Sequence, residues 1–280
     1  MSIKEWVLSA LQEDIQSGDI TTETLLPTPL SAKAVMQAKA SGVFFGHVVL
    51  NTIPEIYPDI TLTHVKPDGA ALAPHDICCH LSGSIQSILA LERTLLNIIQ
   101  HLSGVATLTQ AYVRALNDPR IHILDTRKTT PLMRGLEKQA VVCGGGYNHR
   151  HGLYDMMLIK ENHLRPYITT YGIPALNDQL IAFKAANPHI GVEIEVQSPD
   201  LIDELHLPAI DVIMCDNMTH AALHQSIDRI NRLAPHILKE VSGNIRLDTI
   251  AAYRGMAIDR ISVGALTHSA NALDISLLIT

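Results

Sequence analysis

Basic side chains are concentrated in one part of this chain, residues 125–165. The segment holds seven of the 21 lysines and arginines, although the whole chain has a formal net charge of −7. They are Arg127, Lys128, Arg134, Lys138, Arg150, Lys160 and Arg165. Lysine and arginine hold carboxylates and phosphates through charge-assisted hydrogen bonds, which arginine can make in pairs. A cationic segment in an acidic protein therefore predicts a pocket for a small polyanionic ligand.

The position of each basic residue in its local pattern separates two groups. Arg127 and Lys128 directly follow an apolar run, which favours a place at the end of a strand. Arg134 and Lys138 lie beside Glu137 in a helical pattern, and we interpret them as a solvated helix face. We therefore expect Arg127 and Lys128, rather than Arg134 and Lys138, to reach the ligand.

Glycines and histidines in the same segment carry weaker signals. Gly144, Gly145 and Gly146 allow an unusual backbone or a close approach, but neither GxGxxG nor GxxxxGK[ST] occurs here. His149 and His151 have no carboxylate or thiolate partners at metal-ligand spacing. We predict no metal at this histidine pair.

Carboxylates follow two later apolar runs. Glu193 and Glu195 share one face of the run VEIEVQ, because side chains alternate along a strand, and Asp216 ends the run VIMCDN. Enclosed carboxylates are costly unless they are paired or coordinated, so they should meet the cations, ribose hydroxyls or a metal. Ser242-Gly243-Asn244 and Val263-Gly264-Ala265 end the last two runs, where barrels often bind phosphate.

These residues must be positioned by a repeated βα pattern. Strands are predicted to begin near residues 122, 156, 191, 211, 237 and 259, with amphipathic stretches between most of them. Nearly continuous apolar strands indicate a parallel sheet that is buried on both faces. The pattern alone allows an open sheet or an incomplete barrel. Because polar groups follow all six strands, and a barrel gathers strand ends at one mouth, we predict the barrel.

The first hundred residues mix helices and strands. We predict a helix over residues 2–12, strands over 32–40, 60–65 and 76–84, and a buried helix over 89–102. The Ser103-Gly104 pair predicts a break before a second helix at 105–116.

Composition excludes several classes of protein. Aromatic residues make up only 4% of the chain, which argues against base-stacking nucleic-acid modules, as does the negative charge. No apolar stretch approaches the roughly 20 residues of a membrane span, and the first residues lack a signal-peptide layout. Four cysteines without disulfide or zinc spacing favour a reducing cytoplasm.

In combination, these motifs resemble the quinolinate phosphoribosyltransferase family. The matching stretches run in the family's order: EDIQSGDITT (13–22), LERTLLNIIQHLSGVAT (91–107), LDTRKTTP (124–131), LEKQAVVCGGGYNHRHGLYDMMLIKENH (136–163), VEIEVQ (192–197), CDNM (215–218), EVSGNI (240–245) and ISVGALTHSA (261–270). One departure is Pro131-Leu132-Met133, where Pro-Gly-Leu is more usual. The resemblance implies an N-terminal α/β sandwich over residues 1–105, joined by 271–280, and an incomplete parallel β/α barrel over 106–270.

The resemblance also implies an activity, partners and site residues. The activity is phosphoribosyl transfer from phosphoribosyl diphosphate to quinolinate with decarboxylation, giving nicotinate mononucleotide, with Mg²⁺ as cofactor, in a homodimer with shared active sites. It implies substrate binding by Arg93 (from the partner chain), Thr126, Arg127, Lys128, His149, Arg150, Lys160, Glu195, Asp216, Ser242, Gly243, Asn244, Val263, Gly264 and Ala265. Lys128, Lys160, Glu195 and Asp216 would be catalytic. Glu195 and Asp216 would also meet the magnesium, largely through the diphosphate.

Two other functions remain open on sequence alone. One is a related phosphoribosyltransferase-like protein of molybdenum uptake, and the other is a catalytically silent binding paralogue. The intact TRKTTP, NHRHG and IKENH stretches argue against the first alternative, and the complete charged set argues against the second.

Overall fold

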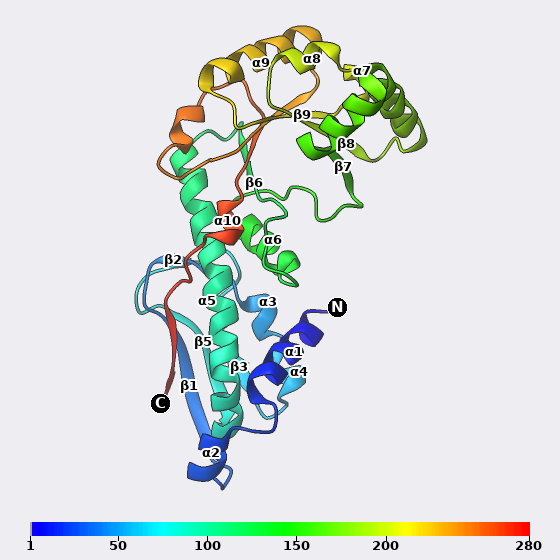
Figure 1. Ribbon diagram of the computed structural model, residues 1–280. Helices are drawn as coiled ribbons and strands as arrows, with labels where there is room; N and C mark the ends of the chain where they lie inside the picture. The colour runs from blue at the N-terminus through cyan, green and yellow to red at the C-terminus, as the bar shows by residue number, and fades with distance from the viewer. Residues whose placement is uncertain (1) are drawn as a thin grey trace. The chain divides into compact units, whose positions relative to one another are not determined.

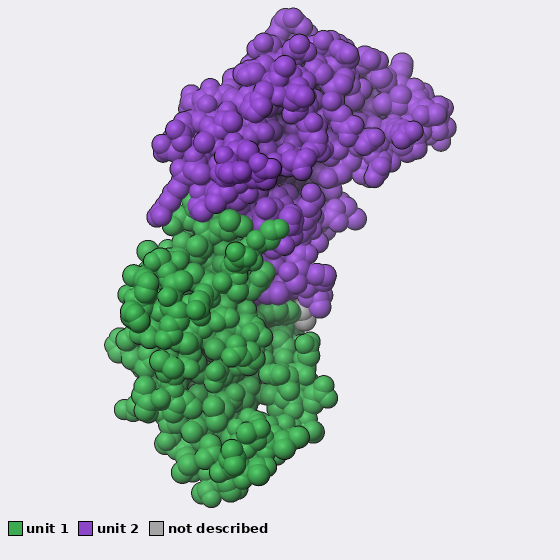
Figure 2. All heavy atoms as spheres, turned by 60° about the vertical axis from the view of Figure 1, so that its left-hand side comes forward, with its two compact units in different colours: residues 1–110, 139–145, 269–280 green, residues 111–138, 146–268 purple. Residues whose placement is uncertain are grey.

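The computed structural model describes residues 2–280 and divides into two compact units (Figure 2). The first unit comprises residues up to 110, residues 139–145 and residues 269–280. The second comprises residues 111–138 and 146–268. The second unit is therefore an insertion into the sequence of the first.

The first unit is built on an antiparallel sheet in the order β12-β1-β5-β3. Its strands are β1 (Ser31–Ala38), β3 (Thr61–Thr63), β5 (Ile77–Ser84) and β12 (Ile275–Ile279). In β1, the buried residues Ala34, Met36 and Ala38 alternate with more exposed ones, so one face of the strand packs on the core. A second, two-stranded sheet pairs β2 (Gly42–Val43) with β4 (Ala71–Leu72).

Short helices complete the first unit. They are α1 (Ile3–Ile15), α2 (Ile20–Leu25), α3 (His47–Leu50) and α4 (Ile53–Ile56). A capping box starts α1, because the Ser2 hydroxyl accepts from the Glu5 amide and the Glu5 carboxylate accepts from the Ser2 amide. Asp19 caps α2 in a similar way through the Thr22 amide.

A single helix, α5 (Ile85–Leu116), spans 32 residues (Figure 1). The prediction of two helices separated at Ser103-Gly104 is therefore wrong. A Cβ added to Gly104 would lie 2.1 Å from the carbonyl oxygen of Asn271. The glycine thus serves a close approach between backbones, which local sequence signals do not reveal.

The second unit contains a six-stranded parallel sheet in the order β6-β11-β10-β9-β8-β7. Its strands are β6 (His122–Leu124), β7 (Met156–Ile159), β8 (Gly191–Val196), β9 (Val212–Asp216), β10 (Leu238–Ser242) and β11 (Arg260–Ser262). All six predicted strands are present. Within residues 2–280, the edge strands β6 and β7 are not paired with each other, so the barrel is incomplete. The predicted fold class is confirmed.

Helices connect these strands. They are α6 (Arg134–Cys143), α7 (Glu161–Ala186), α8 (Asp200–Glu204), α9 (His220–Leu233) and α10 (Ala265–His268), with short 3₁₀ helices at Leu207–Ala209 and Ile250–Tyr253. Figure 1 shows α8 and α9 on the outer side of the strands. A kink at Gly172, whose φ is 80°, divides α7. Among residues 2–280, none of the helices combines the length and the apolar character that crossing a membrane needs.

Along the strand direction, polar side chains form two layers: one at the carboxyl ends of the strands and one two residues earlier. Because side chains alternate, Glu193 shares a face with Glu195, Glu240 with Ser242, and Arg260 with Ser262. Glu193 and Glu240 are fully buried. A charged layer therefore lies one step below the residues at the carboxyl ends of the strands.

Candidate active site

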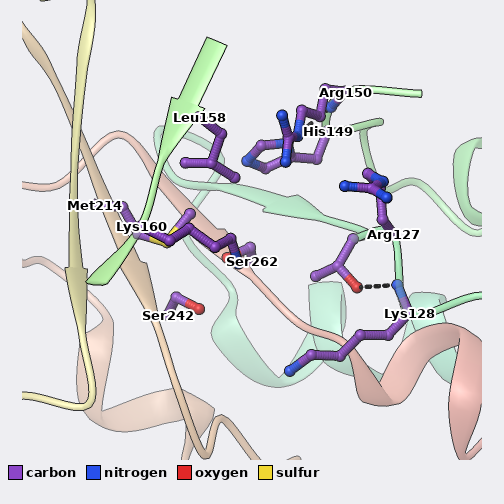
Figure 3. Close-up of a pocket in the computed structure, with 10 residues that line it drawn as sticks. Arg127, Lys128, His149, Arg150, Leu158, Lys160, Met214, Ser242 and Ser262 are labelled. Carbon is purple, nitrogen blue, oxygen red and sulfur yellow. Dashed lines mark hydrogen bonds between the residues drawn. The ribbon is translucent and has the colours of Figure 1, made fainter. Parts of the chain in front are cut away.

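A cavity of about 260 Å³ opens at the carboxyl ends of the parallel strands in the second unit (Figure 3). Its lining residues come from five of the six strands or from the segments that follow them. They are Thr126, Arg127, Lys128, His149, Arg150, Leu158, Lys160, Met214, Ser242 and Ser262. Seven of these ten residues belong to the predicted site. Leu158, Met214 and Ser262 were not predicted.

Clustered positive charge is the main electrostatic feature of the cavity. The pKa of the Arg150 guanidinium is lowered by burial and by the nearby Arg127. The Arg150 side chain is also tethered, because its Nη1 donates to the Met156 carbonyl over 3.1 Å. An anion bound between the two guanidinium groups would offset their electrostatic repulsion and stabilise both charges.

A tight turn holds the predicted strand-end pair Arg127-Lys128. The Lys128 amide donates to Thr126 Oγ1 over 3.0 Å, the bond drawn in Figure 3. The Thr267 hydroxyl donates to the Lys128 carbonyl over 2.7 Å. A Cβ added to Gly264 would lie 2.9 Å from Lys128 Cδ, so the glycine makes room for the lysine stem.

The predicted acids lie beside this cationic set. Glu195 is buried at the end of β8, and its Oε2 lies 3.6 Å from Lys160 Nζ. Burial raises the pKa of Glu195, and the charge of Asp216 at the end of β9 raises it further. The Asn217 side chain donates to Asp216 Oδ2 over 2.7 Å. Two carboxylates on adjacent strands are thus close enough to repel each other.

The predicted phosphate segments follow β10 and β11. Gly243 has a φ of +92°, and an added Cβ there would meet the Asn217 side chain at 2.3 Å. The Asn244 side chain donates to Asn217 Oδ1 over 3.0 Å, and the Asn217 amide donates to the Ser242 carbonyl. Val263, Gly264 and Ala265 lead directly into α10. The arrangement leaves the two segments at neighbouring strand ends.

Arg93 is not among the cavity-lining residues. It lies on α5 in the first unit, where its side chain is exposed. Its predicted role in a neighbouring active site stays a prediction.

The interpretation of Lys138 as part of a solvated helix face is wrong. Lys138 and Asp125 are both fully buried, and Lys138 Nζ donates to Asp125 Oδ1. Lys138 Nζ also donates to the His149 carbonyl over 2.8 Å, and the His149 amide donates to Asp125 Oδ1 over 2.9 Å. The side-chain amide nitrogen of Asn148 faces Asp125 and Lys138, and it donates to Asp125 Oδ2 and to the Lys138 carbonyl. This ion pair holds the segment that carries Arg150.

A second buried network surrounds the His149 ring. Its Nε2 lies 3.1 Å from Glu193 Oε2 and 3.5 Å from Glu240 Oε1. Arg260 lies below both acids, with Nε 2.6 Å from Glu240 Oε2 and Nη2 3.3 Å from Glu193 Oε2. Burial lowers the pKa of His149, but the two carboxylates outweigh it and raise the pKa to about 9. The alternation of β10 and β11 could have indicated Glu240 and Arg260, because each lies two residues before a predicted strand end.

Comparison with known proteins assigns the chain. Residues 19–103 match the N-terminal domain of quinolinate phosphoribosyl transferase, and residues 105–278 match its C-terminal domain. The chain is 37% identical to a probable nicotinate-nucleotide pyrophosphorylase [carboxylating] of Bacillus subtilis, covering 100% of this chain and 94% of the relative. It is 36% identical to the nicotinate-nucleotide pyrophosphorylase [carboxylating] of Mycobacterium leprae, covering 98% and 96%.

Solved structures agree with this assignment. The crystal structure of NadC from Streptococcus pyogenes matches with a TM-score of 0.89 and 39% identity, covering 99% of this chain and 97% of that one. The nicotinate-nucleotide pyrophosphorylase from Francisella tularensis matches with a TM-score of 0.88 and 32% identity, covering 99% and 96%. Both domains, the full-length relatives and the fold therefore give one answer: the chain belongs to the quinolinate phosphoribosyl transferase family.

Proposed function

We propose that this protein transfers the phosphoribosyl group of phosphoribosyl diphosphate to quinolinate and releases diphosphate and carbon dioxide, giving nicotinate mononucleotide for NAD biosynthesis. The observation that carries the proposal is the joint placement of Arg127, Lys128, Arg150 and Lys160 around one cavity. Quinolinate has two carboxylates, and phosphoribosyl diphosphate has several phosphate charges. A cationic pocket with acids at its edge suits both substrates.

The chemistry divides between the cations and the acids. The cations would hold the quinolinate carboxylates and the leaving diphosphate, so that the pyridine nitrogen faces the anomeric carbon. As the bond to diphosphate breaks, positive charge develops on the ribose, and Glu195 and Asp216 would stabilise it. Attack by the pyridine nitrogen forms the new bond, the 2-carboxylate leaves as carbon dioxide, and the ring carbon that held it takes up a proton from water. The reaction needs no covalent enzyme nucleophile.

The donor set fits magnesium. Glu195 and Asp216 offer hard carboxylate oxygens at adjacent strand ends, and the raised pKa of Glu195 reflects first its burial and then the charge of Asp216 next to it. We propose that these two residues hold the ion together with the substrate diphosphate. Magnesium would neutralise charge on the diphosphate and so make it a better leaving group.

The two segments after β10 and β11 would bind the 5′-phosphate. Residues 242–244 and 263–265 offer main-chain amides at adjacent strand ends, and the positive φ of Gly243 and Asn244 turns the chain there. Ser262 is buried, lines the cavity and directly precedes the second of these segments, so its hydroxyl is placed to meet a ligand.

We also propose a cytoplasmic homodimer in which Arg93 enters the partner's site. In the second unit, the side chains of Leu132, Leu153 and Tyr154 are 80%, 74% and 80% exposed. Large exposed apolar side chains favour contact with a second copy. The four cysteines are free thiols, which suits a reducing compartment.

An assay of diphosphate release tests the function. Purified protein with phosphoribosyl diphosphate and Mg²⁺ should release diphosphate only when quinolinate is added, and labelled carbon dioxide should appear in equal amount. Nicotinate in place of quinolinate is the matched control, because it lacks the carboxylate that is lost. Activity with nicotinate alone, or with neither acid, would contradict the proposal.

A further inference from the structure

The buried ion pair of Asp125 and Lys138 connects the two chain segments that bring Arg127 and Arg150 to the cavity. Asp125 lies two residues before Arg127, and His149 directly precedes Arg150. The His149 amide donates to Asp125 Oδ1 over 2.9 Å, and the His149 carbonyl accepts from Lys138 Nζ over 2.8 Å. Because Lys138 Nζ also donates to Asp125 Oδ1, one ion pair holds both main-chain groups of His149.

The Asp125 side chain extends a main-chain pairing that ends just before the cavity. The Tyr147 amide donates to the Ile123 carbonyl over 2.8 Å, and the Asp125 amide donates to the Tyr147 carbonyl over 3.1 Å. A longer parallel ladder would pair the His149 amide with the Asp125 carbonyl. That amide instead bonds the Asp125 side chain. An aspartate side chain reaches farther than a main-chain carbonyl, so the two segments stay connected where the ladder has ended.

The ion pair is expensive to bury, which argues against a purely stabilising role. Asp125 and Lys138 are both fully buried. Burial raises the pKa of the Asp125 carboxyl and lowers the pKa of the Lys138 ammonium. Apolar residues of similar volume are often as stabilising as a buried ion pair, because they avoid the cost of removing two charges from water. Apolar residues would, however, give no directional hydrogen bonds to the main chain beside Arg150.

We propose that Asp125 and Lys138 are positioning residues that set the distance between the guanidinium groups of Arg127 and Arg150. The inference rests on the proposed function, because a fixed distance matters most for a ligand with two neighbouring carboxylates. Figure 3 shows the two arginine side chains next to each other at the cavity. Burial, and then repulsion from Arg127, lowers the pKa of Arg150. The ion pair opposes this repulsion, and a displacement of about 1 Å can cost about 100-fold in rate.

The second unit contains a matched ion pair outside the cavity lining. Lys184 Nζ lies 2.6 Å from Asp211 Oδ2 and also donates to the Ile190 carbonyl over 3.2 Å. The Asp211 side chain accepts from the Val192 amide over 2.7 Å. This pair is half-buried, and Asp211 directly precedes β9, at the opposite end of the strand from Asp216. It repeats the hydrogen bonds of the first pair without a cavity arginine beside it, so it serves as the control.

Binding of two ring dicarboxylates tests the spacing. Phthalate carries its carboxylates on adjacent ring carbons and isophthalate carries them one carbon further apart. Neither has the pyridine nitrogen, so calorimetry measures binding without turnover. We expect Asp125→Leu/Lys138→Met, which leaves no unpaired buried charge, to lose about 10-fold of the wild-type preference for phthalate. Asp211→Leu/Lys184→Met should keep that preference. A folded Asp125→Leu/Lys138→Met protein with the wild-type preference would overturn the inference, even if its turnover is lower.

Two milder variants refine the test. Asp125→Asn keeps an oxygen that can accept from the His149 amide, so it should keep the preference for phthalate within about 3-fold of wild type. Asn148→Ala removes an exposed side chain that donates to both Asp125 and the Lys138 carbonyl, and should lower the preference by about 3-fold. If the leucine-methionine variant does not fold, as judged by its melting curve, an unchanged preference in Asn148→Ala would overturn the inference.

The binding measurement separates this inference from the proposed function. A preference for phthalate that falls only in the variants of the Asp125–Lys138 pair supports the spacing role, even if the protein releases no diphosphate with quinolinate. That combination would contradict the proposed function alone. Equal binding of the two dicarboxylates to an active wild-type protein would contradict the spacing role alone.

Discussion

The ammonium group of Lys160 lies 3.6 Å from Glu195 Oε2, across the ends of neighbouring strands β7 and β8. This contact joins the cationic half of the cavity to the acidic pair Glu195 and Asp216. We therefore expect Lys160 to exchange the carboxylate for an incoming anionic substrate. For this reason the acids and the cations are best tested together.

Removing one carboxylate of the acidic pair should weaken the dependence of catalysis on magnesium. We expect Asp216→Asn to lower kcat by about 10- to 100-fold and to raise the Mg²⁺ concentration needed for half-maximal rate, because a charged oxygen ligand is lost. Steady-state rates over a magnesium series measure both effects. Asp228→Asn, an exposed acid on α9, is the control. An unchanged magnesium requirement in Asp216→Asn would exclude Asp216 as a ligand.

Arg127→Ala should abolish turnover in a folded protein. Its side chain is exposed to the cavity, so its loss removes a substrate contact and little packing. We expect at least about a 100-fold loss in kcat/KM with an unchanged melting temperature. Arg232→Ala on α9 makes the same change of charge at an exposed position outside the cavity lining and should have no effect. A wild-type kcat/KM in Arg127→Ala would show that Arg127 is not part of the site.

Mixed dimers should reveal whether Arg93 serves the partner chain. Arg93→Ala and Arg127→Ala should each be inactive alone, because every site lacks one residue. Random mixing of the two variants should give heterodimers with one intact site each, and so recover about a quarter of wild-type activity. Mixing each variant with itself is the control. Absence of any recovery, with exchange of subunits demonstrated, would speak against sharing.

Leu132 should prefer glycine for reasons of backbone geometry alone. It has a φ of 64°, in the left-handed region that glycine adopts most readily. Leu132→Gly should be more stable than Leu132→Ala by about 1 kcal/mol, because only glycine adopts this conformation without steric cost. Comparing the two variants cancels the loss of the leucine side chain. At Leu153, which is exposed without a positive φ, the glycine variant should be the less stable one. Equal free energies of unfolding of Leu132→Gly and Leu132→Ala, measured in urea, would show that the positive φ causes no backbone strain.

Asp118 should make stability depend on pH in the acidic range. The Arg120 side chain and the Gly255 amide donate to its carboxylate, which holds the pKa of Asp118 well below its ordinary value. A depressed pKa contributes stability above the unfolded pKa of about 4 and loses it as the pH falls toward the folded value. Asp118→Asn should therefore melt below wild type near neutrality, and the gap should narrow in acid. A gap that stays constant down to about pH 3 would show that the charge plays no part.

The hydrophobic pattern of the sequence predicted the secondary structure that depends on neighbouring residues. The six parallel strands are apolar runs bounded by polar residues, and their alternation placed Glu195 and Asp216 correctly at strand ends. The failures come from contacts between distant residues. Gly104 resembles a helix break, but it faces Asn271, which is far away in the sequence. Lys138 resembles a solvated residue because its partner Asp125 lies on a different element.

The strand β12 pairs with β1, although more than two hundred residues separate them in the sequence. During synthesis, one edge of β1 (Ser31–Ala38) therefore stays unpaired until β12 (Ile275–Ile279) leaves the ribosome. The inserted unit can complete its own sheet before that moment, because all its strands lie earlier in the chain. The sheet of the first unit is thus the last to be completed during synthesis. Until then the unpaired edge of β1 can pair with other chains, so this is the period in which we expect aggregation and the need for chaperones to be greatest.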